Sequence, residues 1–300
     1  MRVSRGKCTG RAPVIDRPRL LAEALMEFSS DVLTLSVDHH VATLWLDRPE
    51  ARNALGSALW RDLPRACAAI EEDTEVRVVV LAARGPHFSV GLDLKELGSS
   101  LTGTGSHRSP AAANAASYAA VRAMQASVNS LADLAVPVIA AVHGYCIGGG
   151  VDLICAADIR LASSTAIFSV RETKVAIVAD LGTLQRLPRI IGSGHVAELA
   201  FTGEDIGAER AAAIGLVNSL HGDSDEDVFG AAVDLARRIA ANSPLAVKGT
   251  KAVLRAADER AIADGLDFVA RWNTMYLKSN DLAEAMAAFA ERRAPVFRGD

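Results

Sequence analysis

The stretch that decides the fold reads HGYCIGGGVDL and runs from His143 to Leu153. It follows a short apolar run at 137–142 and continues into an apolar, helix-like segment at 151–157. Consecutive glycines between a buried strand and a helix let a ligand approach the backbone and free N–H groups to bind it. The start of the helix favours an anion or a developing negative charge. A flexible strand-to-helix turn is an equally good interpretation of these residues alone. A dinucleotide fingerprint is disfavoured, because it needs glycine where Leu153 stands.

The segments before this stretch alternate between strand and helix patterns. Residues 41–47 (VATLWLD) and 76–83 (VRVVVLAA) are short β-rich runs, and residues 56–72 carry apolar side chains at helical spacing. We expect a long helix over 115–134, preceded by a loop in the Gly/Ser/Ala-rich segment 98–113. This order predicts α/β units joined by right-handed crossovers.

From about residue 225 the pattern is helical to the end of the chain. Ile262, Leu266, Val269, Trp272 and Tyr276 recur at steps of 4, 3, 3 and 4, which places them on one stripe of a long helix. The residues alone therefore predict a layered α/β core with a helical C-terminal appendage.

The composition is that of an ordinary globular protein. Its 300 residues allow one large domain or two modest ones, and the net charge of −4 argues against a nucleic-acid partner. No apolar run reaches the roughly 18–20 residues that span a bilayer, so no membrane partner is expected. The four cysteines lack disulfide-framework spacing and indicate reduced thiols, which favours a cytoplasmic location.

The N-terminus differs from the rest of the chain. Six arginines and lysines and one acid, Asp16, occupy the first 20 residues, without the apolar core of a signal peptide. A disordered extension and an organelle transit peptide both fit this composition, the extension better. We therefore divide the chain into an N-terminal extension at 1–30, a core at 31–235 and a C-terminal helical region at 236–300.

Three carboxylic acids follow the glycine run. Asp152 begins the helix-like segment, Glu172 follows a β-like stretch at 166–170, and Asp180 lies in the mostly apolar stretch 175–184. Isolated acids are usually solvated surface residues. The apolar residues on both sides of Asp180 make a surface position less expected for it. Carboxyl groups that share a dry pocket acquire raised and separated pKa values, which divides acid and base roles between them. The residues alone thus suggest proton transfer.

Three segments, taken in order, resemble the crotonase (enoyl-CoA hydratase/isomerase) superfamily. They are RPEARNAL at 48–55, FSVGLD at 88–93 and GGGVD at 148–152, and the resemblance extends from about residue 31 to residue 293. It implies an α/β fold, the crotonase (ClpP-like) spiral of ββα units with a helical C-terminal trimerisation region. The assemblies that it implies are a homotrimer or a homohexamer.

In this family two backbone N–H groups grip the thioester oxygen of an acyl-CoA substrate. Matching the motifs places this oxyanion hole at Leu92 and Gly149, and places the loop 90–94 along the acyl-CoA. The substrate-binding residues implied by the resemblance, with one cation for the CoA phosphates, are Val90, Gly91, Leu92, Asp93, Leu94, Gly149 and Arg52. Coenzyme A is part of the substrate, so no separate cofactor is expected. No metal is expected either, because the seven histidines lack metal-ligand spacing.

The acids separate branches of the family. Hydratases carry glutamates at the positions of Asp152 and Glu172, and a glycine-rich stretch where this chain has Asp180. Aspartates at the first and third positions are similar to the dienoyl-CoA isomerase branch, as are PVIAAVHG at 137–144 and Trp272-Asn273. The resemblance therefore implies isomerisation of 3,5-dienoyl-CoA to 2,4-dienoyl-CoA in fatty-acid β-oxidation.

Such an isomerisation moves a proton from C2 to C6 through a dienolate. By the resemblance Glu172 serves C2 and Asp180 serves C6, with the reverse assignment open, while Asp152 orients the other two or tunes their pKa values. One alternative is a 2-enoyl-CoA hydratase in which Asp152 replaces the usual glutamate. An alternative of another class is a non-catalytic crotonase-fold binding or scaffold protein.

Overall fold

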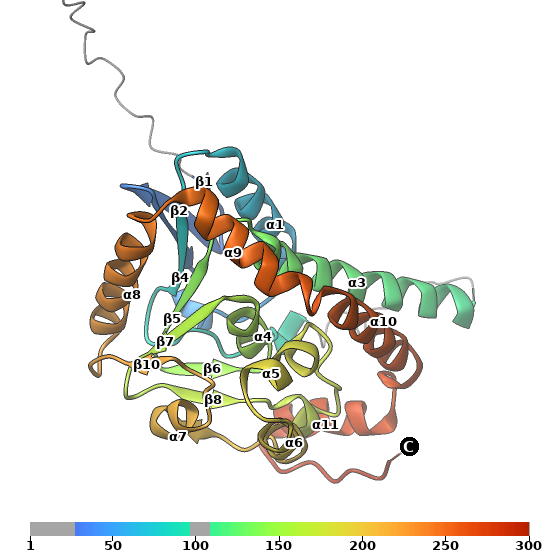
Figure 1. The fold of residues 1–300 in the computed structure, drawn as a ribbon. Helices are drawn as coiled ribbons and strands as arrows, with labels where there is room; N and C mark the ends of the chain where they lie inside the picture. Colours follow the sequence, from blue (N-terminus) through green and yellow to red (C-terminus); the bar gives the residue numbers. More distant parts are fainter. Residues whose placement is uncertain (1–27, 97–108, 300) are drawn as a thin grey trace, which may run out of the picture.

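The structure, a computed structural model, describes residues 28–96 and 109–299 (Figure 1). Its larger sheet has seven strands in the order β1-β2-β3-β4-β5-β7-β10. These strands are β1 Phe28–Ser29, β2 Leu33–Asp38, β3 Val41–Leu46, β4 Val78–Ala83, β5 Val138–Val142, β7 Ile159–Ala162 and β10 Ser219–Leu220. The first three pair antiparallel, and every pairing from β3 to β10 is parallel.

A second, three-stranded sheet consists of β6 Tyr145–Ile147, β8 Ile167–Ser169 and β9 Ile206–Gly207. It lies next to the larger sheet, because β6 follows β5 and β8 follows β7 after short turns (Figure 1). Successive strand pairs are each followed by a helix, as in β2-β3-α1 and β5-β6-α4. The chain thus advances through repeated ββα units.

The helices of the core are α1 Ser57–Glu72, α3 Pro110–Asp133, α4 Gly149–Ala156, α5 Thr183–Ile190, α6 Ser193–Thr202 and α7 Ala208–Ala213. Towards the C-terminus follow α8 Asp225–Ala240, α9 Pro244–Ala256, α10 Glu259–Tyr276 and α11 Asn280–Glu291. Two short 3-10 turns, η1 Pro49–Ala51 and η2 Glu172–Val175, lie in the loops.

The central strands are buried on both faces, as their continuous apolar sequences require. Every residue of β4 (VVVLAA) and β5 (VIAAV) is buried. α1 and α3 pack in the main core on one face, whereas α8 covers the other with Val228, Ala232 and Ala236 (Figure 1). These small side chains recur every four residues and let the helix approach the sheet closely.

Most predicted elements are found within a few residues of their expected bounds, and one expectation is wrong. The loop does not extend to residue 113, because α3 begins at Pro110, where the Ser109 side chain accepts a hydrogen bond from the N–H of Ala112. The expected stripe lies on α10; Leu266 and Val269 in it are buried, and Trp272 and Tyr276 are 40% and 56% exposed.

The expected domain limits do not coincide with the ends of helices or strands. Described structure begins with β1 at Phe28, before residue 31, and the limit between 235 and 236 lies inside α8. The expectations for the N-terminal extension concern residues that lie mainly outside the described part of the chain. No helix in the described ranges is long and apolar enough to cross a bilayer.

Candidate active site

Backbone hydrogen bonds link the two glycine-containing loops, 88–93 and 145–149, which follow β4 and β5. Ser89 accepts a hydrogen bond from the N–H of Ile147 (3.0 Å) and donates its own N–H to the carbonyl of Tyr145 (2.9 Å). On its other side, the loop accepts a bond at Gly91 from the N–H of Leu55 (2.8 Å). The segments 53–55, 88–93 and 145–149 therefore form one hydrogen-bonded unit.

Two glycines are required by this unit. Gly91 has φ +85°, and a Cβ there would lie 2.8 Å from the carbonyl oxygen of Ile147. Gly148 has φ +52°, and a Cβ there would lie 3.4 Å from Oε1 of Glu172. Side chains other than hydrogen are strained at both conformations, and at Gly91 the added Cβ would also press against the loop at Ile147.

The N–H groups of Leu92 and Gly149 donate to no described residue, whereas the N–H groups of Gly91, Asp93 and Gly148 are bonded. The two loops touch, because a Cβ on Gly91 would also lie 3.5 Å from the backbone nitrogen of Gly149. Gly149 is the first residue of α4, so its N–H lies at the positive end of the helix. Both N–H groups are therefore available to an acceptor from outside the described protein.

Asp152 is buried in the first turn of α4. Its Oδ1 accepts hydrogen bonds from the backbone N–H (2.6 Å) and the hydroxyl (2.7 Å) of Thr183, at the start of α5. Burial raises its pKa to about 7, and the two bonds from Thr183 oppose that rise. The side chain is thus held in one orientation by a neighbouring helix.

Glu172 begins η2, next to Gly148. Its Oε2 is buried and has no hydrogen-bond partner in the described structure. Burial, followed by the charge of Asp152, raises its pKa to about 8. A buried carboxyl oxygen without a protein donor is unfavourable for folding, and such groups concentrate at functional sites.

Asp180 lies in the segment between η2 and α5. Its Oδ2 accepts a hydrogen bond from the side-chain amide of Asn273 on α10 (2.6 Å). Burial raises its pKa to about 6, and the bond from Asn273 opposes the rise. The three acids therefore interact in one desolvated cluster with pKa values that are raised and separated.

The predicted substrate-binding residues differ in exposure and in the contacts that they make. Val90, Leu92 and Leu94 are half-buried along the loop, whereas Arg52 is exposed and forms no ion pair with a described residue. Asp93 instead has a structural role: its Oδ2 accepts from Arg48 (2.9 Å), and its Oδ1 accepts from backbone N–H groups that follow it. Although burial opposes it, the Arg48 guanidinium lowers the pKa of this carboxyl.

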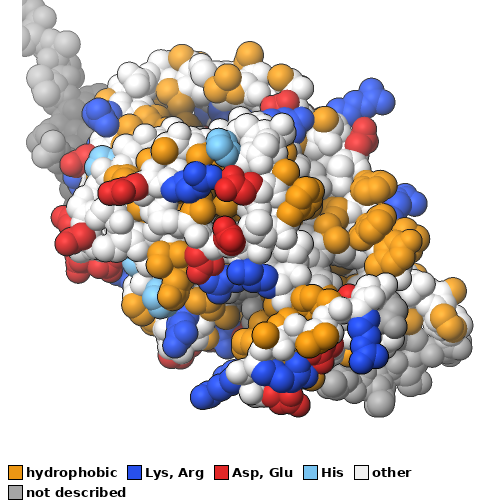
Figure 2. Space-filling view, turned by 90° about the horizontal axis from the view of Figure 1, so that it is seen from below, with side chains coloured by type: hydrophobic (Ala, Val, Ile, Leu, Met, Phe, Trp, Pro, Cys, Tyr) orange, Lys and Arg blue, Asp and Glu red, His pale blue; other side chains and the backbone are white. Residues whose placement is uncertain are grey.

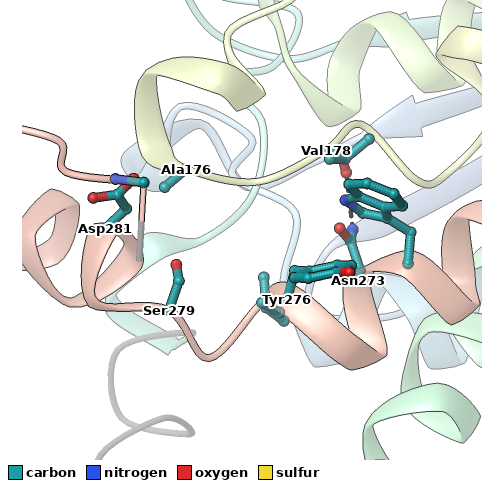
Figure 3. A pocket seen from close by; sticks show the side chains of 9 residues that line it. Ala176, Val178, Asn273, Tyr276, Ser279 and Asp281 are labelled. Atoms are coloured by element: carbon teal, nitrogen blue, oxygen red, sulfur yellow. Dashed lines mark hydrogen bonds between the residues drawn. The ribbon is translucent and has the colours of Figure 1, made fainter.

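A cavity of about 520 Å³ opens beside the cluster, between η2, α10 and the C-terminal segment. Ala176, Val178, Tyr276 and Asn273 are among its lining residues (Figure 3). The three acids do not line it, and Asn273 connects the cavity wall to the cluster. In the described ranges no group of three His, Cys, Asp or Glu side chains could hold a metal ion.

Sequence reasoning missed the residues that hold the acids. Thr183 lies three positions after Asp180, and no local pattern distinguishes it from an ordinary helix-capping threonine. Arg48 stands in the first characteristic motif, but its pairing with Asp93 was not predicted. Asn273 was noted only as part of a resemblance, and its contact with Asp180 spans 93 positions.

Comparison with known proteins identifies the family. The family model described as enoyl-CoA hydratase/isomerase matches residues 36–300. The mitochondrial Delta(3,5)-Delta(2,4)-dienoyl-CoA isomerase of Dictyostelium discoideum is 43% identical over 86% of this chain and 87% of its own length. The peroxisomal protein of that name from Arabidopsis thaliana is 40% identical, over 89% of this chain and 96% of its own.

Comparison with solved structures indicates the same family. Carnitinyl-CoA hydratase from Mycobacterium avium is 30% identical and has a TM-score of 0.76, with 91% of this chain and 100% of that chain covered. The expected crotonase fold is thereby confirmed, with its α/β core and C-terminal helices. On the extent of the family match and the identity to these relatives, the chain belongs to the enoyl-CoA hydratase/isomerase family of enzymes.

Proposed function

We propose that this chain isomerises 3,5-dienoyl-CoA thioesters to 2,4-dienoyl-CoA thioesters in fatty-acid β-oxidation. The observation that carries the proposal is the cluster of Asp152, Glu172 and Asp180, in which burial raises all three pKa values, beside two unpaired backbone N–H groups. Relatives that are up to 43% identical bear the name of this activity.

The reaction breaks a C2–H bond, delocalises the electron pair over the diene and the thioester oxygen, and forms a C6–H bond. Glu172 is assigned to C2, because it lies beside Gly148 and hence near the N–H of Gly149 that would hold the thioester oxygen. Asp180, tied to α10, is assigned to C6. Leu92 and Gly149 stabilise the dienolate, and losing one such donor typically costs about 3–4 kcal/mol.

Proton balance requires one carboxyl of the pair to be ionised and the other protonated. With pKa values of about 8 for Glu172 and about 6 for Asp180, the pair holds one proton between these limits. After each turnover Glu172 holds the proton taken from C2 and Asp180 is ionised. Because Glu172 has the higher pKa, protonated Glu172 with ionised Asp180 is also the more stable arrangement. Before the next turnover, proton exchange must return the pair to ionised Glu172 and protonated Asp180. If the two acids had the reverse assignment, the reaction would start from protonated Glu172 and ionised Asp180.

The nearest alternative is a 2-enoyl-CoA hydratase. Water activation would fall to Asp152, but that carboxyl already accepts two hydrogen bonds from Thr183 through one oxygen and is buried. Asp180 would then have no role in the chemistry. A non-catalytic binding protein would not need three desolvated acids, whose raised pKa values oppose folding at neutral pH.

The direct test uses purified protein with 3,5-octadienoyl-CoA and, separately, crotonyl-CoA. Absorbance of the conjugated 2,4-diene follows isomerisation, and loss of enoyl-thioester absorbance follows hydration. Diene formation with little hydration is the expected result. Hydration without diene formation would transfer the function to the hydratase, and a folded protein that turns over neither substrate would support the non-catalytic alternative.

Neither a cofactor nor a metal is part of the proposal, since coenzyme A arrives with the substrate. A cytoplasmic location remains a prediction, with organelle import through the basic N-terminus as the alternative. The names of two relatives place them in mitochondria and peroxisomes. Fluorescence of a fusion carrying residues 1–30 ahead of a reporter, with the same reporter alone as control, separates the two locations.

A homotrimer, or a hexamer of paired trimers, is the proposed assembly. Phe268, Trp272, Met275 and Tyr276 expose apolar side chains on α10, at 67%, 40%, 63% and 56%. Exposed hydrophobic side chains gather toward one end of the face in Figure 2. Patches of this kind are typical of protein interfaces. Light scattering on the wild type and on Phe268→Glu should give a trimer or hexamer for the first and smaller species for the second.

A further inference from the structure

Asp180 is held by two side-chain amides from two different helices. Gln125 on α3 donates from Nε2 to the backbone carbonyl of Asp180 (2.7 Å) and to the carbonyl of Leu266 (2.9 Å). Asn273 on α10 donates from Nδ2 to the carboxylate of Asp180 (2.6 Å) and to the carbonyl of Val178 (2.9 Å). One amide therefore anchors the backbone, and the other reaches the reacting group itself.

The Asn273 amide has little freedom. It is a buried side chain, 2% exposed, and its two Nδ2 hydrogens are used by Asp180 and Val178. Figure 3 shows its amide turned toward the Val178 carbonyl at the wall of the cavity. The opposite amide orientation would place the side-chain oxygen against a carbonyl and a carboxylate, so the donor assignment is determined by the contacts.

Only one oxygen of the Asp180 carboxylate is used in this way. Oδ2 accepts from Asn273, the carboxylate also accepts from the backbone N–H of Asp180 itself, and no other described residue donates to Oδ1. A fixed Oδ2 leaves Oδ1 as the atom that can exchange a proton without breaking the anchoring bond. A neutral amide also has no proton to lose at these pH values, so it does not compete for the proton in transfer.

We infer that Asn273 is a positioning residue for the reaction: its amide holds Oδ2 of Asp180 so that Oδ1 exchanges the proton at C6. This inference rests on the proposed function, since it assigns Asp180 to the chemistry. It ties the geometry of the active site to α10, a helix outside the ββα core. The role is distinct from that of Gln125, which supports the same segment without touching the carboxyl group.

Charged groups from the neighbouring elements also act on Asp180 or its partners. Asp152 on α4 and Glu172 on η2 interact with it electrostatically, and Arg186 on α5 interacts with Asp152. An Asn273 substitution adds or removes none of these charged groups. A shift in the acid limb of the pH–rate profile after that substitution therefore reports the lost hydrogen bond.

The experiment compares Asn273→Ala with Gln125→Met, both in the full chain with 3,5-octadienoyl-CoA. For Asn273→Ala we expect kcat to fall roughly 10- to 100-fold, because the carboxyl loses the bond that orients Oδ1 towards C6, with KM changed less than about threefold. Its acid limb should move to higher pH, because the ionised form of Asp180 loses its donor. Gln125→Met should lower Tm and leave the acid limb in place.

Asn273→Gln keeps an amide and serves as the conservative variant. It should regain part of kcat and show a smaller shift of the acid limb than alanine does. If Asn273→Ala does not fold, Asn273→Gln and Asn273→Ser carry the same comparison. An unshifted acid limb in the folded Asn273 variants, or an equal shift in Gln125→Met, would overturn the inference.

A separate readout distinguishes failure of this inference from failure of the proposed function. Carbon-13 NMR of aspartate carboxyl groups, with Asp180→Asn to assign the signal, follows the ionisation of Asp180 without any substrate. If the wild type forms no diene, the proposed function falls, and the inferred role in the reaction falls with it. If the wild type forms diene but the Asp180 signal titrates identically in Asn273→Ala, the inference alone fails.

Discussion

Replacing Glu172 by glutamine should make the protein more stable at alkaline pH while removing most of its activity. The folded-state pKa of about 8 lies above the usual 4.5, because burial opposes ionisation and Oε2 lacks a protein donor. The stabilising contribution of the protonated side chain is complete below the unfolded pKa and is lost as the pH rises through about 8. A glutamine at this position does not titrate, so its contribution does not change with pH.

The size of the effect follows from linkage. At pH 5 the wild-type carboxyl is protonated in the folded state and mostly ionised in the unfolded state, which costs about 1 kcal/mol of stability; at pH 8.5 that cost approaches about 5 kcal/mol. The difference between Glu172→Gln and wild type should therefore shift by about 4 kcal/mol between these pH values, or about half of this, allowing for solvent around a half-buried side chain. The loss of a general acid/base should reduce kcat roughly 10²- to 10⁴-fold.

The assay is urea unfolding of both proteins at pH 5 and pH 8.5, together with isomerase rates. Glu209→Gln, which changes an exposed glutamate on α7, is the matched control and should show no such pH-dependent difference. The reasoning fails if the unfolding free energies of Glu172→Gln and wild type differ by the same amount at both pH values. It also fails if the wild type becomes relatively more stable as the pH rises.

Three further outcomes are expected. The pH dependence of kcat should be bell-shaped with limbs near 6 and 8, because activity requires one proton on the pair of acids assigned to C2 and C6; a flat profile over this range would contradict the pairing. Gly91→Ala should lower kcat at least roughly 100-fold by moving an oxyanion donor, whereas Gly194→Ala, where a Cβ would meet nothing within 4 Å, should be neutral in the same rate assay. Thr183→Val should raise the pKa of Asp152 by removing one of its two donors, and an unchanged carboxyl titration by NMR would disprove that contact.

Much of the fold could be predicted from local patterns. The continuous apolar runs of β4 and β5 indicate strands covered on both faces, and the structure buries every residue of each. The start of α3 was placed too late, although Ser109-Pro110 is itself a helix-start signal, because the alanine-rich sequence after it was assigned to the loop. The C-terminal helices were expected, but their apolar stripe did not indicate which part faces the core.

The candidate residues of the site could be proposed from the sequence, whereas their arrangement could not. The family resemblance implies Leu92, Gly149 and the roles of the three acids, because the motifs that carry it are local features of the sequence. Which groups hold those acids depends on packing: Thr183 reaches Asp152 across 31 positions, and Asn273 reaches Asp180 across 93. Period and turn signals describe neighbours along the chain, whereas burial and hydrogen-bond partners arise only when α4, α5 and α10 pack together. The sequence by itself therefore determined the elements and the chemical groups, and only the tertiary structure decided how far each acid is desolvated and which donor holds it.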